Sequence, residues 1–434
     1  MSDDAGARRA PETERLLERF LRYARIHTTS REASTTTPST ACQLDLARLL
    51  LEELTALGLE ARLDARGYVY GRLPARLPAG RAAGSVPAIG LIAHMDTSED
   101  APGENVRPQI HRAYAGGEIV LPGDPSQVLR PEENPALARH IGDDIITSDG
   151  TTLLGADDKA GVAEILEALE RIAGDPGCFH GPICVAFTPD EEVGRGADHF
   201  DVEGFGARVA YTLDGETLGR IDNETFNAHS AEFRLQGYNV HPGTAKGRMI
   251  NTLYAAAEIL RRLPEDMRPE TTEGRQGYLH PRGIAGGVDR CAIQLLVRDF
   301  DLRGSAEKIR LLERVRDDVG ALFPRVEIAL EVRERYLNMR PRLDENPRVT
   351  EIALEACRRA GVEPRLEVIR GGTDGARLCT MGILTPNVFT GGENYHSVRE
   401  WASLQAMEKA VQVILQIVQL WLAEGAAKGP GRQR

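Results

Sequence analysis

Closely spaced cysteines are missing from this sequence of 434 residues. Its six cysteines are scattered and form no CxxC pair, which argues against a disulfide framework and against a cysteine-ligated zinc site. The pattern predicts reduced thiols, and therefore a cytoplasmic protein.

Long apolar runs and an excess of positive charge are also missing. No stretch approaches the length of a membrane span, and the first residues are too polar and charged for a signal peptide. The net charge of −12 argues against nucleic acid or an anionic membrane as the main partner. We therefore expect a globular protein of two or three domains that binds neither nucleic acid nor a membrane.

The pattern of predicted helices and strands indicates one domain inserted into another. Up to residue 226, and again from residue 342, helices accompany short apolar strands, which is typical of an α/β fold. Between these parts the order becomes strand, helix, strand, helix, strand. We expect a discontinuous domain of residues 1–226 and 342–434, and a small α/β domain of residues 227–341 inserted into it.

Two adjacent glutamates, Glu191 and Glu192, follow the apolar residues 183–187, which are expected to form a buried strand. Open α/β sheets bind their ligands at such strand ends. Adjacent side chains diverge there, so one glutamate can face a metal ion while the other faces a reacting water. An isolated acidic pair is more often a solvated turn, so the prediction depends on other polar groups at strand ends.

A histidine and an aspartate end another predicted strand. His94 and Asp96 come directly after the apolar residues 88–93, and residues i and i+2 of a strand share a face. His94 can therefore bind a metal while Asp96 holds its other ring nitrogen. A buried structural histidine explains this pair equally well.

Further acidic and histidine residues occupy similar positions. Asp157 and Asp158 begin a predicted helix, where one of them suffices as a cap and the other is left for another task. Asp214 follows the apolar residues 209–213, and His396 follows a glycine-rich turn.

These groups together predict a metal centre. Its candidate ligands are His94, Asp157, Glu192 (or Glu191), Asp214 and His396. Two imidazoles and three carboxylates suit divalent zinc. A shared carboxylate would let five ligands hold two Zn²⁺ ions, an arrangement that recurs in hydrolysis. The glutamate that is left over would be a general base.

The sequence resembles the peptidase T family, tripeptide aminopeptidases of the di-zinc metallopeptidases, over nearly its whole length. The matching blocks are residues 93–97, 153–161, 186–194, 211–215, 239–247, 298–301, 370–375 and 389–392. The resemblance implies a zinc-peptidase-type catalytic domain with a mixed, largely parallel sheet flanked by helices. It also implies that the inserted domain is ferredoxin-like and serves as a lid and dimerisation domain, and hence a homodimer.

The resemblance also implies a role for each ligand. His94 and Asp214 would bind one zinc ion, and Glu192 and His396 would bind the other. Asp157 would bridge the two ions.

Three further residues near these ligands would complete the catalytic site. Asp158 would follow Asp157 through a strained peptide bond. Asp96 would orient His94. Glu191 would take a proton from the attacking water and pass it to the departing amine.

Substrate binding is implied for three residues farther along the chain. His241 would polarise the substrate carbonyl, and Arg298 and Arg370 would hold the carboxylate of the peptide. Two residues beside His396 depart from the family pattern. Glu393 stands in place of an aromatic residue and Ser397 in place of a glycine, which puts strict tripeptide specificity in doubt.

The implied activity is removal of the N-terminal residue from tripeptides. One alternative is a related di-zinc dipeptidase, carboxypeptidase or N-acyl amino-acid hydrolase, and a requirement for a free amine separates it from an aminopeptidase. The other is a non-catalytic peptide-binding protein, which would have lost ligands or the base. All five ligands and Glu191 are present.

Overall fold

The computed structural model describes residues 10–82 and 84–427 and contains two compact units. Unit 1 is formed by the chain up to Asn223, by Arg342–Glu367 and by the chain from Thr373. Unit 2 is formed by Glu224–Pro341 and Val368–Gly372. The short segment at Val368 was not foreseen as part of the inserted unit.

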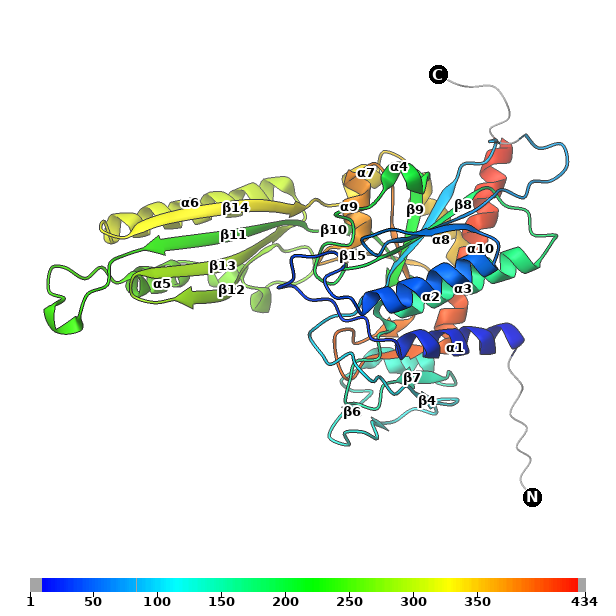
Figure 1. Ribbon diagram of the computed structural model, residues 1–434, viewed down its shortest axis with the longest axis horizontal. Coiled ribbons are helices and arrows are strands. Elements are labelled where there is room, and N and C mark those ends of the chain that lie inside the picture. The colour runs from blue at the N-terminus through cyan, green and yellow to red at the C-terminus, as the bar shows by residue number, and fades with distance from the viewer. Residues whose placement is uncertain (1–9, 83, 428–434) are drawn as a thin grey trace. The chain divides into compact units, whose positions relative to one another are not determined.

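A mixed sheet of eight strands, ordered β1-β2-β8-β3-β9-β16-β10-β15, forms the centre of unit 1 (Figure 1). The strands are β1 Glu60–Leu63, β2 Val69–Leu73, β3 Ile89–His94, β8 Ile183–Thr188, β9 Val209–Gly215, β10 Arg220–Thr225, β15 Arg365–Ile369 and β16 Asn387–Phe389. Strands β8, β3, β9 and β16 run parallel to one another, whereas β1, β2 and β10 pair antiparallel. The expected mixed, largely parallel sheet is confirmed.

Helices cover both faces of this sheet, which is why its parallel strands are mostly apolar. On one side the core includes residues of α1 Pro11–Ala24, α2 Gln43–Ala56, α3 Ala156–Gly174, α8 Arg348–Arg359 and α10 Leu404–Ala427. On the other side lie α4 Val202–Phe205 and α9 Asp374–Thr380. The short helix α7 is Arg340–Leu343.

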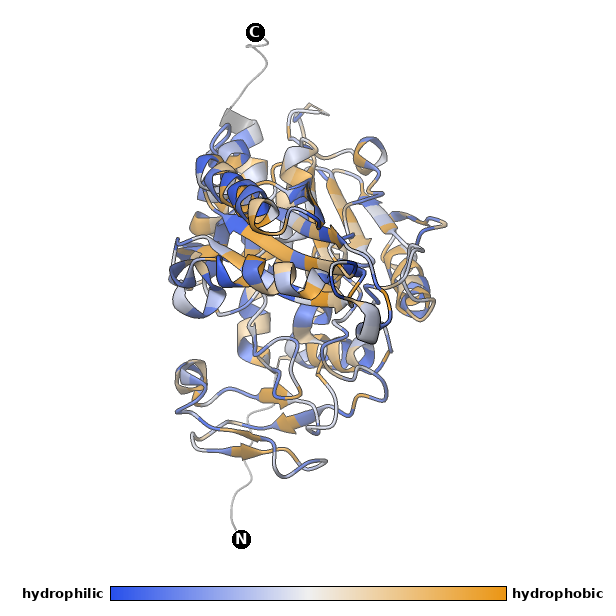
Figure 2. Ribbon diagram, turned by 90° about the vertical axis from the view of Figure 1, so that its left-hand side faces the viewer, coloured by the Kyte–Doolittle hydropathy of each residue, from blue (hydrophilic) through white to orange (hydrophobic). Residues whose placement is uncertain are grey.

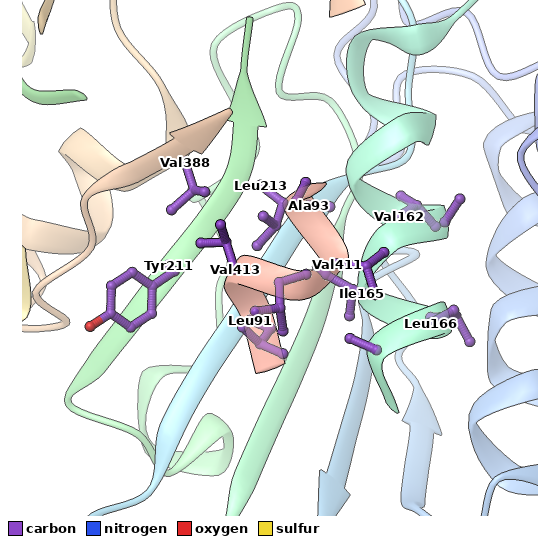
Figure 3. Close-up of a cluster of buried hydrophobic side chains, with 14 of the residues drawn as sticks. Leu91, Ala93, Val162, Ile165, Leu166, Tyr211, Leu213, Val388, Val411 and Val413 are labelled. Carbon is purple, nitrogen blue, oxygen red and sulfur yellow. The ribbon is translucent and has the colours of Figure 1, made fainter. Parts of the chain in front are cut away.

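Figure 3 shows the packing of α3 and α10 on the strands. Leu91 and Tyr211 of the sheet belong to the same hydrophobic cluster as Ile165 of α3 and Val411 of α10. All four side chains are fully buried. Figure 2 shows the helices striped with hydrophobic and hydrophilic residues, as expected for helices that bury one face.

Two small sheets complete unit 1. One has the order β17-β18-β7-β4 and contains β17 Gly392–Glu393, β18 Trp401–Ser403, β7 Ile145–Thr147 and β4 Gln109–His111. The other is an antiparallel pair of β5 Ile119–Val120 and β6 Val128–Leu129, followed by the 3₁₀ helix Pro135–His140.

Unit 2 is a ferredoxin-like sandwich, as expected. Its elements are β11 Asn227–Gln236, α5 Thr252–Arg261, β12 Tyr278–Gly286, β13 Arg290–Asp299, α6 Leu302–Leu322 and β14 Glu327–Tyr336. The strands form an antiparallel sheet of order β12-β13-β11-β14, and residues of α5 and α6 share its core. Short 3₁₀ helices are Pro242–Thr244, Glu265–Met267 and Pro269–Thr271.

The expected order of three strands was wrong by one, because strand β12 was missed. This edge strand contains Pro281, Gly283 and Gly286, and its pairing with β13 shifts between Pro281 and Gly283. Proline and glycine in a strand are tolerated at edges and bulges, so the apolar alternation that marks a strand is absent here.

Two expectations about composition can be compared with the structure. All six cysteines are free thiols. Within the described ranges, none of the helices has the length and apolar character needed to cross a membrane.

Candidate metal centre

Three of the candidate ligand segments lie at adjacent strand ends of unit 1. Strands β8, β3 and β9 are neighbours and parallel, so their carboxyl ends meet at one edge of the sheet. His94 is the last residue of β3, Asp214 is the penultimate residue of β9, and Glu191 and Glu192 follow β8. Sheet order alone therefore brings these side chains together.

Asp157 lies between the two histidines. Its Oδ1 is 2.9 Å from His94 Nε2, and its Oδ2 is 3.3 Å from His396 Nε2. Glu192 Oε2 is 2.8 Å from the same nitrogen of His396, and Asp214 Oδ1 is 3.6 Å from His94 Nε2. The five expected ligands thus form one cluster, with Asp157 in the middle.

The start of helix α3 reaches this cluster through a close approach to β9. A Cβ on Gly161 would lie 1.9 Å from the carbonyl oxygen of Leu213, so only glycine fits there. The peptide bond between Asp157 and Asp158 is cis. Asp158 Oδ2 accepts a hydrogen bond from the backbone N–H of His94 at 3.1 Å.

Both histidines have an oxygen beside the ring nitrogen that faces away from Asp157. His94 Nδ1 is 3.0 Å from the backbone oxygen of Asp96 and 3.5 Å from its Oδ1. His396 Nδ1 is 3.1 Å from Asp100 Oδ2. Such partners fix the ring orientation and leave Nε2 for a metal. Asp100 was not recognised from the sequence, because it follows the strand end by six residues in an irregular segment.

Asp190, which directly precedes the two glutamates, fixes the turn that carries them. This buried residue has φ = 61°, a conformation that is uncommon for non-glycine residues. Its carboxylate accepts hydrogen bonds from the backbone N–H of Ser39 (2.9 and 2.8 Å) and from Gln43 Nε2 (2.8 Å). The backbone of the turn is therefore held in one conformation.

Hydrogen bonds to the two histidines lower the pKa of Asp157 despite its burial, but the other carboxyl groups of the cluster have too little positive charge around them to offset burial. Burial raises the pKa of Glu191 well above its usual value. Burial and the nearby charge of Asp157 together raise the pKa of Glu192 to about 8, and burial raises that of Asp214 to about 6. Hydrogen bonds to Asp157 and Glu192 raise the pKa of His396 to about 12. The chain alone thus supplies too little positive charge for so many buried carboxylates.

A divalent cation fits this environment. Two sets of three ligand atoms lie within 4.8 Å of one another: those of His94, Asp157 and Glu192, and those of His94, Asp158 and Asp214. Glu192 Oε1 and Asp158 Oδ1 are buried and have no hydrogen-bond partner among the described residues. Imidazole and carboxylate donors are those that zinc prefers, and a cation would satisfy both the charge and the unpaired oxygens.

The three candidates for substrate binding lie in unit 2. His241 is exposed, and its Nδ1 accepts a hydrogen bond from the backbone N–H of Gly243 at 3.1 Å. Arg298 donates to the carbonyl oxygens of His229 and Val297, both at 3.0 Å.

Arg370 is engaged by its own unit on several sides. It donates to the carbonyl oxygens of Gly274 (2.8 Å) and Gln276 (2.9 Å) and to Thr272 Oγ1 (2.9 Å). Its guanidinium also lies over the rings of Phe226 and Tyr278. These contacts give Arg370 a structural task within unit 2.

Two buried acids near the cluster were not singled out from the sequence. Asp374 accepts a hydrogen bond from Thr188 Oγ1 at 2.7 Å, and burial raises its pKa to about 7. It belongs to the block of residues 370–375 that matches the peptidase T family, and this match could have identified it. Glu400 accepts hydrogen bonds from the backbone at the start of α3, and the sequence around it carries no signal, because its partners are remote in the chain.

The two residues that depart from the family pattern have local partners. Thr217 Oγ1 donates a hydrogen bond to Glu393, and burial raises the pKa of Glu393. Ser397 Oγ accepts a hydrogen bond from the backbone N–H of Arg399 at 3.1 Å.

Comparison with known proteins places this chain in a family. The model of peptidase family M20/M25/M40 matches residues 149–420. A relative from Clostridium acetobutylicum named peptidase T is 46% identical over 409 residues, which cover 94% of this chain and 99% of the relative. The chain therefore belongs to peptidase family M20/M25/M40 and, within it, to the peptidase T family, which confirms the resemblance seen in the sequence.

Two solved structures share the fold. An aminopeptidase PepT from Bacillus cereus superimposes with a TM-score of 0.72, and a tripeptidase from Staphylococcus aureus with a TM-score of 0.74. Each is 23% identical in that comparison and covers 95% of this chain and 99% of its own. The α/β fold with an inserted smaller domain is thus the fold of these proteins.

Proposed function

We propose that this chain is a metallo-aminopeptidase that removes the N-terminal residue from tripeptides with the help of two Zn²⁺ ions. The observation that carries the proposal is the position of Asp157, whose two carboxylate oxygens lie 2.9 Å and 3.3 Å from the Nε2 atoms of His94 and His396. In a member of the peptidase T family, one carboxylate between two imidazoles supports a pair of cations with a shared ligand.

The two cations would be held by distinct pairs of residues. His94 and Asp214 would hold one, Glu192 and His396 would hold the other, and Asp157 would bridge them. When bound, the two cations polarise the carbonyl group of the scissile peptide and acidify the attacking water.

The chain's own residues would then move the proton. Glu191 lies beside Glu192 but takes no part in the close contacts of the two histidines. We assign to its carboxylate the acceptance of a proton from the attacking water and its donation to the leaving amine nitrogen. Asp96, which accepts the backbone N–H groups of both glutamates, would keep the carboxylate of Glu191 directed away from the ligands.

Three residues of unit 2 remain proposed substrate contacts. His241 would polarise the substrate carbonyl, since its imidazole is exposed and its Nδ1 is engaged only by a local turn. Arg298 and Arg370 would hold the C-terminal carboxylate of the substrate.

We also propose that unit 2 has the roles of lid and dimerisation domain. The free cysteines support a further proposal, that the enzyme works in the cytoplasm.

A peptide panel with metal removal tests the proposal. The protein is stripped with a strong chelator, reloaded with Zn²⁺, and assayed with di-, tri- and tetrapeptides and with N-acetylated tripeptides. We expect activity on free tripeptides that is lost with the metal and restored by Zn²⁺. Cleavage of the N-acetylated peptides would instead favour an N-acyl amino-acid hydrolase or carboxypeptidase, and preference for dipeptides would favour a dipeptidase. Activity that ignores both chelator and zinc would refute the metal centre.

A further inference from the structure

One buried carboxylate, that of Glu400, holds the turn that leads into Asp157. Glu400 is 1% exposed. Its Oε2 accepts hydrogen bonds from the backbone N–H groups of Leu154 and Gly155, both at 2.8 Å, and its Oε1 accepts one from the backbone N–H of Asp157 at 2.9 Å. Three hydrogen bonds from consecutive parts of one turn thus converge on a single side chain.

One of these bonds acts as a cap of helix α3, because the N–H of Asp157 belongs to its first turn, whereas Leu154 and Gly155 precede the helix. The first N–H groups of a helix have no partner within the helix, and no side chain of the N-cap residue Gly155 can serve them. A carboxylate is the strongest acceptor for such groups, because it is charged and lies at the positive end of the helix. Glu400 supplies it from more than two hundred residues away in the sequence.

The backbone of Glu400 is itself well anchored. Its N–H donates to the carbonyl oxygen of Ser397 at 3.1 Å. The next residue, Trp401, begins β18 and pairs with Thr147 of β7. Because the carboxylate sits on a fixed backbone, it can hold the turn in position rather than follow it.

The same short loop also carries a metal ligand. His396 lies four positions before Glu400 in the sequence, and its Nε2 is 3.3 Å from Asp157 Oδ2. One loop therefore presents His396 to Asp157 and, through Glu400, holds the backbone of Asp157. This loop therefore contributes to the relative position of these two ligands.

We propose that Glu400 is a positioning residue of the metal centre, which sets Asp157 so that its two oxygens face both histidines before any cation binds. This inference rests on the proposed function, since it assumes that Asp157 binds metal. Glu400 touches neither a cation nor the substrate in this role, and it acts through the backbone of Asp157.

A buried glutamate on the same helix provides a matched control. Glu164 of α3 is fully buried, and neither of its oxygens has a hydrogen-bond partner in the described part of the chain. Glu164→Gln and Glu400→Gln make the same chemical change at two buried carboxyl groups. Only the second removes acceptors from the turn before Asp157, because an amide presents one oxygen and one NH₂ group where the carboxylate presented two oxygens.

The experiment measures Zn²⁺ binding by the metal-stripped full-length protein, by competition with a chelator of known affinity. Amide hydrogen exchange of the stripped protein is measured in parallel. For Glu400→Gln we expect zinc affinity to fall about 10–100-fold, the range found for residues that support metal ligands. Exchange at Leu154, Gly155 and Asp157 should become faster, while Glu164→Gln matches the wild type in both measurements.

Several outcomes would overturn the inference. Wild-type zinc affinity in a folded Glu400→Gln variant, or an equal loss of affinity in Glu164→Gln, would show that Glu400 does not set the ligand. Glu400→Asp, which keeps the charge, is prepared as well; if both Glu400 variants fail to fold, Glu400 stabilises the fold in general and the inference is wrong. A wild-type protein that binds no zinc would refute the proposed function instead, and the amide exchange would still decide whether Glu400 holds the turn.

Discussion

The backbone N–H of Glu191 donates a hydrogen bond to Asp96 Oδ1 at 2.9 Å. The other oxygen of Asp96 accepts the N–H of Glu192 at 3.2 Å, and Oδ1 is also 3.5 Å from His94 Nδ1. Asp96 was expected to orient His94. Its carboxylate also joins the end of β3 to the turn after β8, and this fixes the backbone from which the two glutamates extend.

Substitutions of Glu191 and Glu192 are expected to affect different properties, namely turnover and metal binding. Glu192→Gln should weaken one metal site and lower the zinc content, because the side chain is a proposed ligand. Glu191→Gln should bind two zinc ions while kcat falls about 10²–10⁴-fold, the usual contribution of a general base. Metal stoichiometry and kcat of both variants check this. If Glu191→Gln loses a metal and Glu192→Gln loses only turnover, the two roles are exchanged; normal turnover in both variants would refute the catalytic role of the turn.

The contribution of Glu164 to the free energy of unfolding is expected to become less favourable as the pH rises. Burial raises its pKa well above the usual value, so the folded protein keeps the proton over a range in which the unfolded chain releases it. Folding is then favoured below the carboxyl pKa of the unfolded chain, and this stability is lost as the pH rises towards the folded value.

The variant Glu164→Met tests this, since it fills the space without a carboxyl group. Its free energy of unfolding in urea should exceed that of the wild type, with a gap that widens as the pH rises above the usual carboxyl pKa, at up to about 1.4 kcal/mol per pH unit. Parallel curves for the two proteins across this range would show that Glu164 does not titrate as described.

Amidation of the substrate should reveal recognition of its C-terminus. Replacing the carboxylate of a good tripeptide by an amide should lower kcat/KM about 10–100-fold, because a charged hydrogen bond contributes about 1.5–3 kcal/mol. Among the described contacts, Arg298 donates only from Nη1, whereas Arg370 uses both Nη atoms. Arg298→Lys should therefore reduce the discrimination between acid and amide more than Arg370→Lys. Equal cleavage of both peptides by the wild type would rule out such a contact.

His241 should affect turnover rather than folding. Its imidazole is exposed and supports only a local turn through Gly243, so His241→Ala should keep both metals and the melting temperature. If the imidazole stabilises charge on the substrate oxygen, kcat should fall about 10²–10³-fold. A variant with unchanged kcat would leave His241 as an ordinary loop residue.

Strand ends were the part of the site that the sequence could predict. The runs before His94, Glu191 and Asp214 are short, apolar and buried on both faces, and this pattern is distinctive for parallel strands. Strand β12 was missed because its proline and glycines suit an exposed edge, where burial imposes no pattern.

By itself, the sequence determined the α/β class, the inserted unit, the family and the residues of the cluster, because apolar periodicity and short motifs depend on neighbours in the chain. Only the tertiary structure decided that Asp157 lies between two histidines, that Asp96 holds the turn of the glutamates, and that Glu400 holds the turn before Asp157. Each of these contacts joins segments that are remote in sequence. A carboxylate that accepts a distant backbone N–H leaves no local pattern, since its partner has no side-chain signature and its position depends on how the whole sheet and its loops pack.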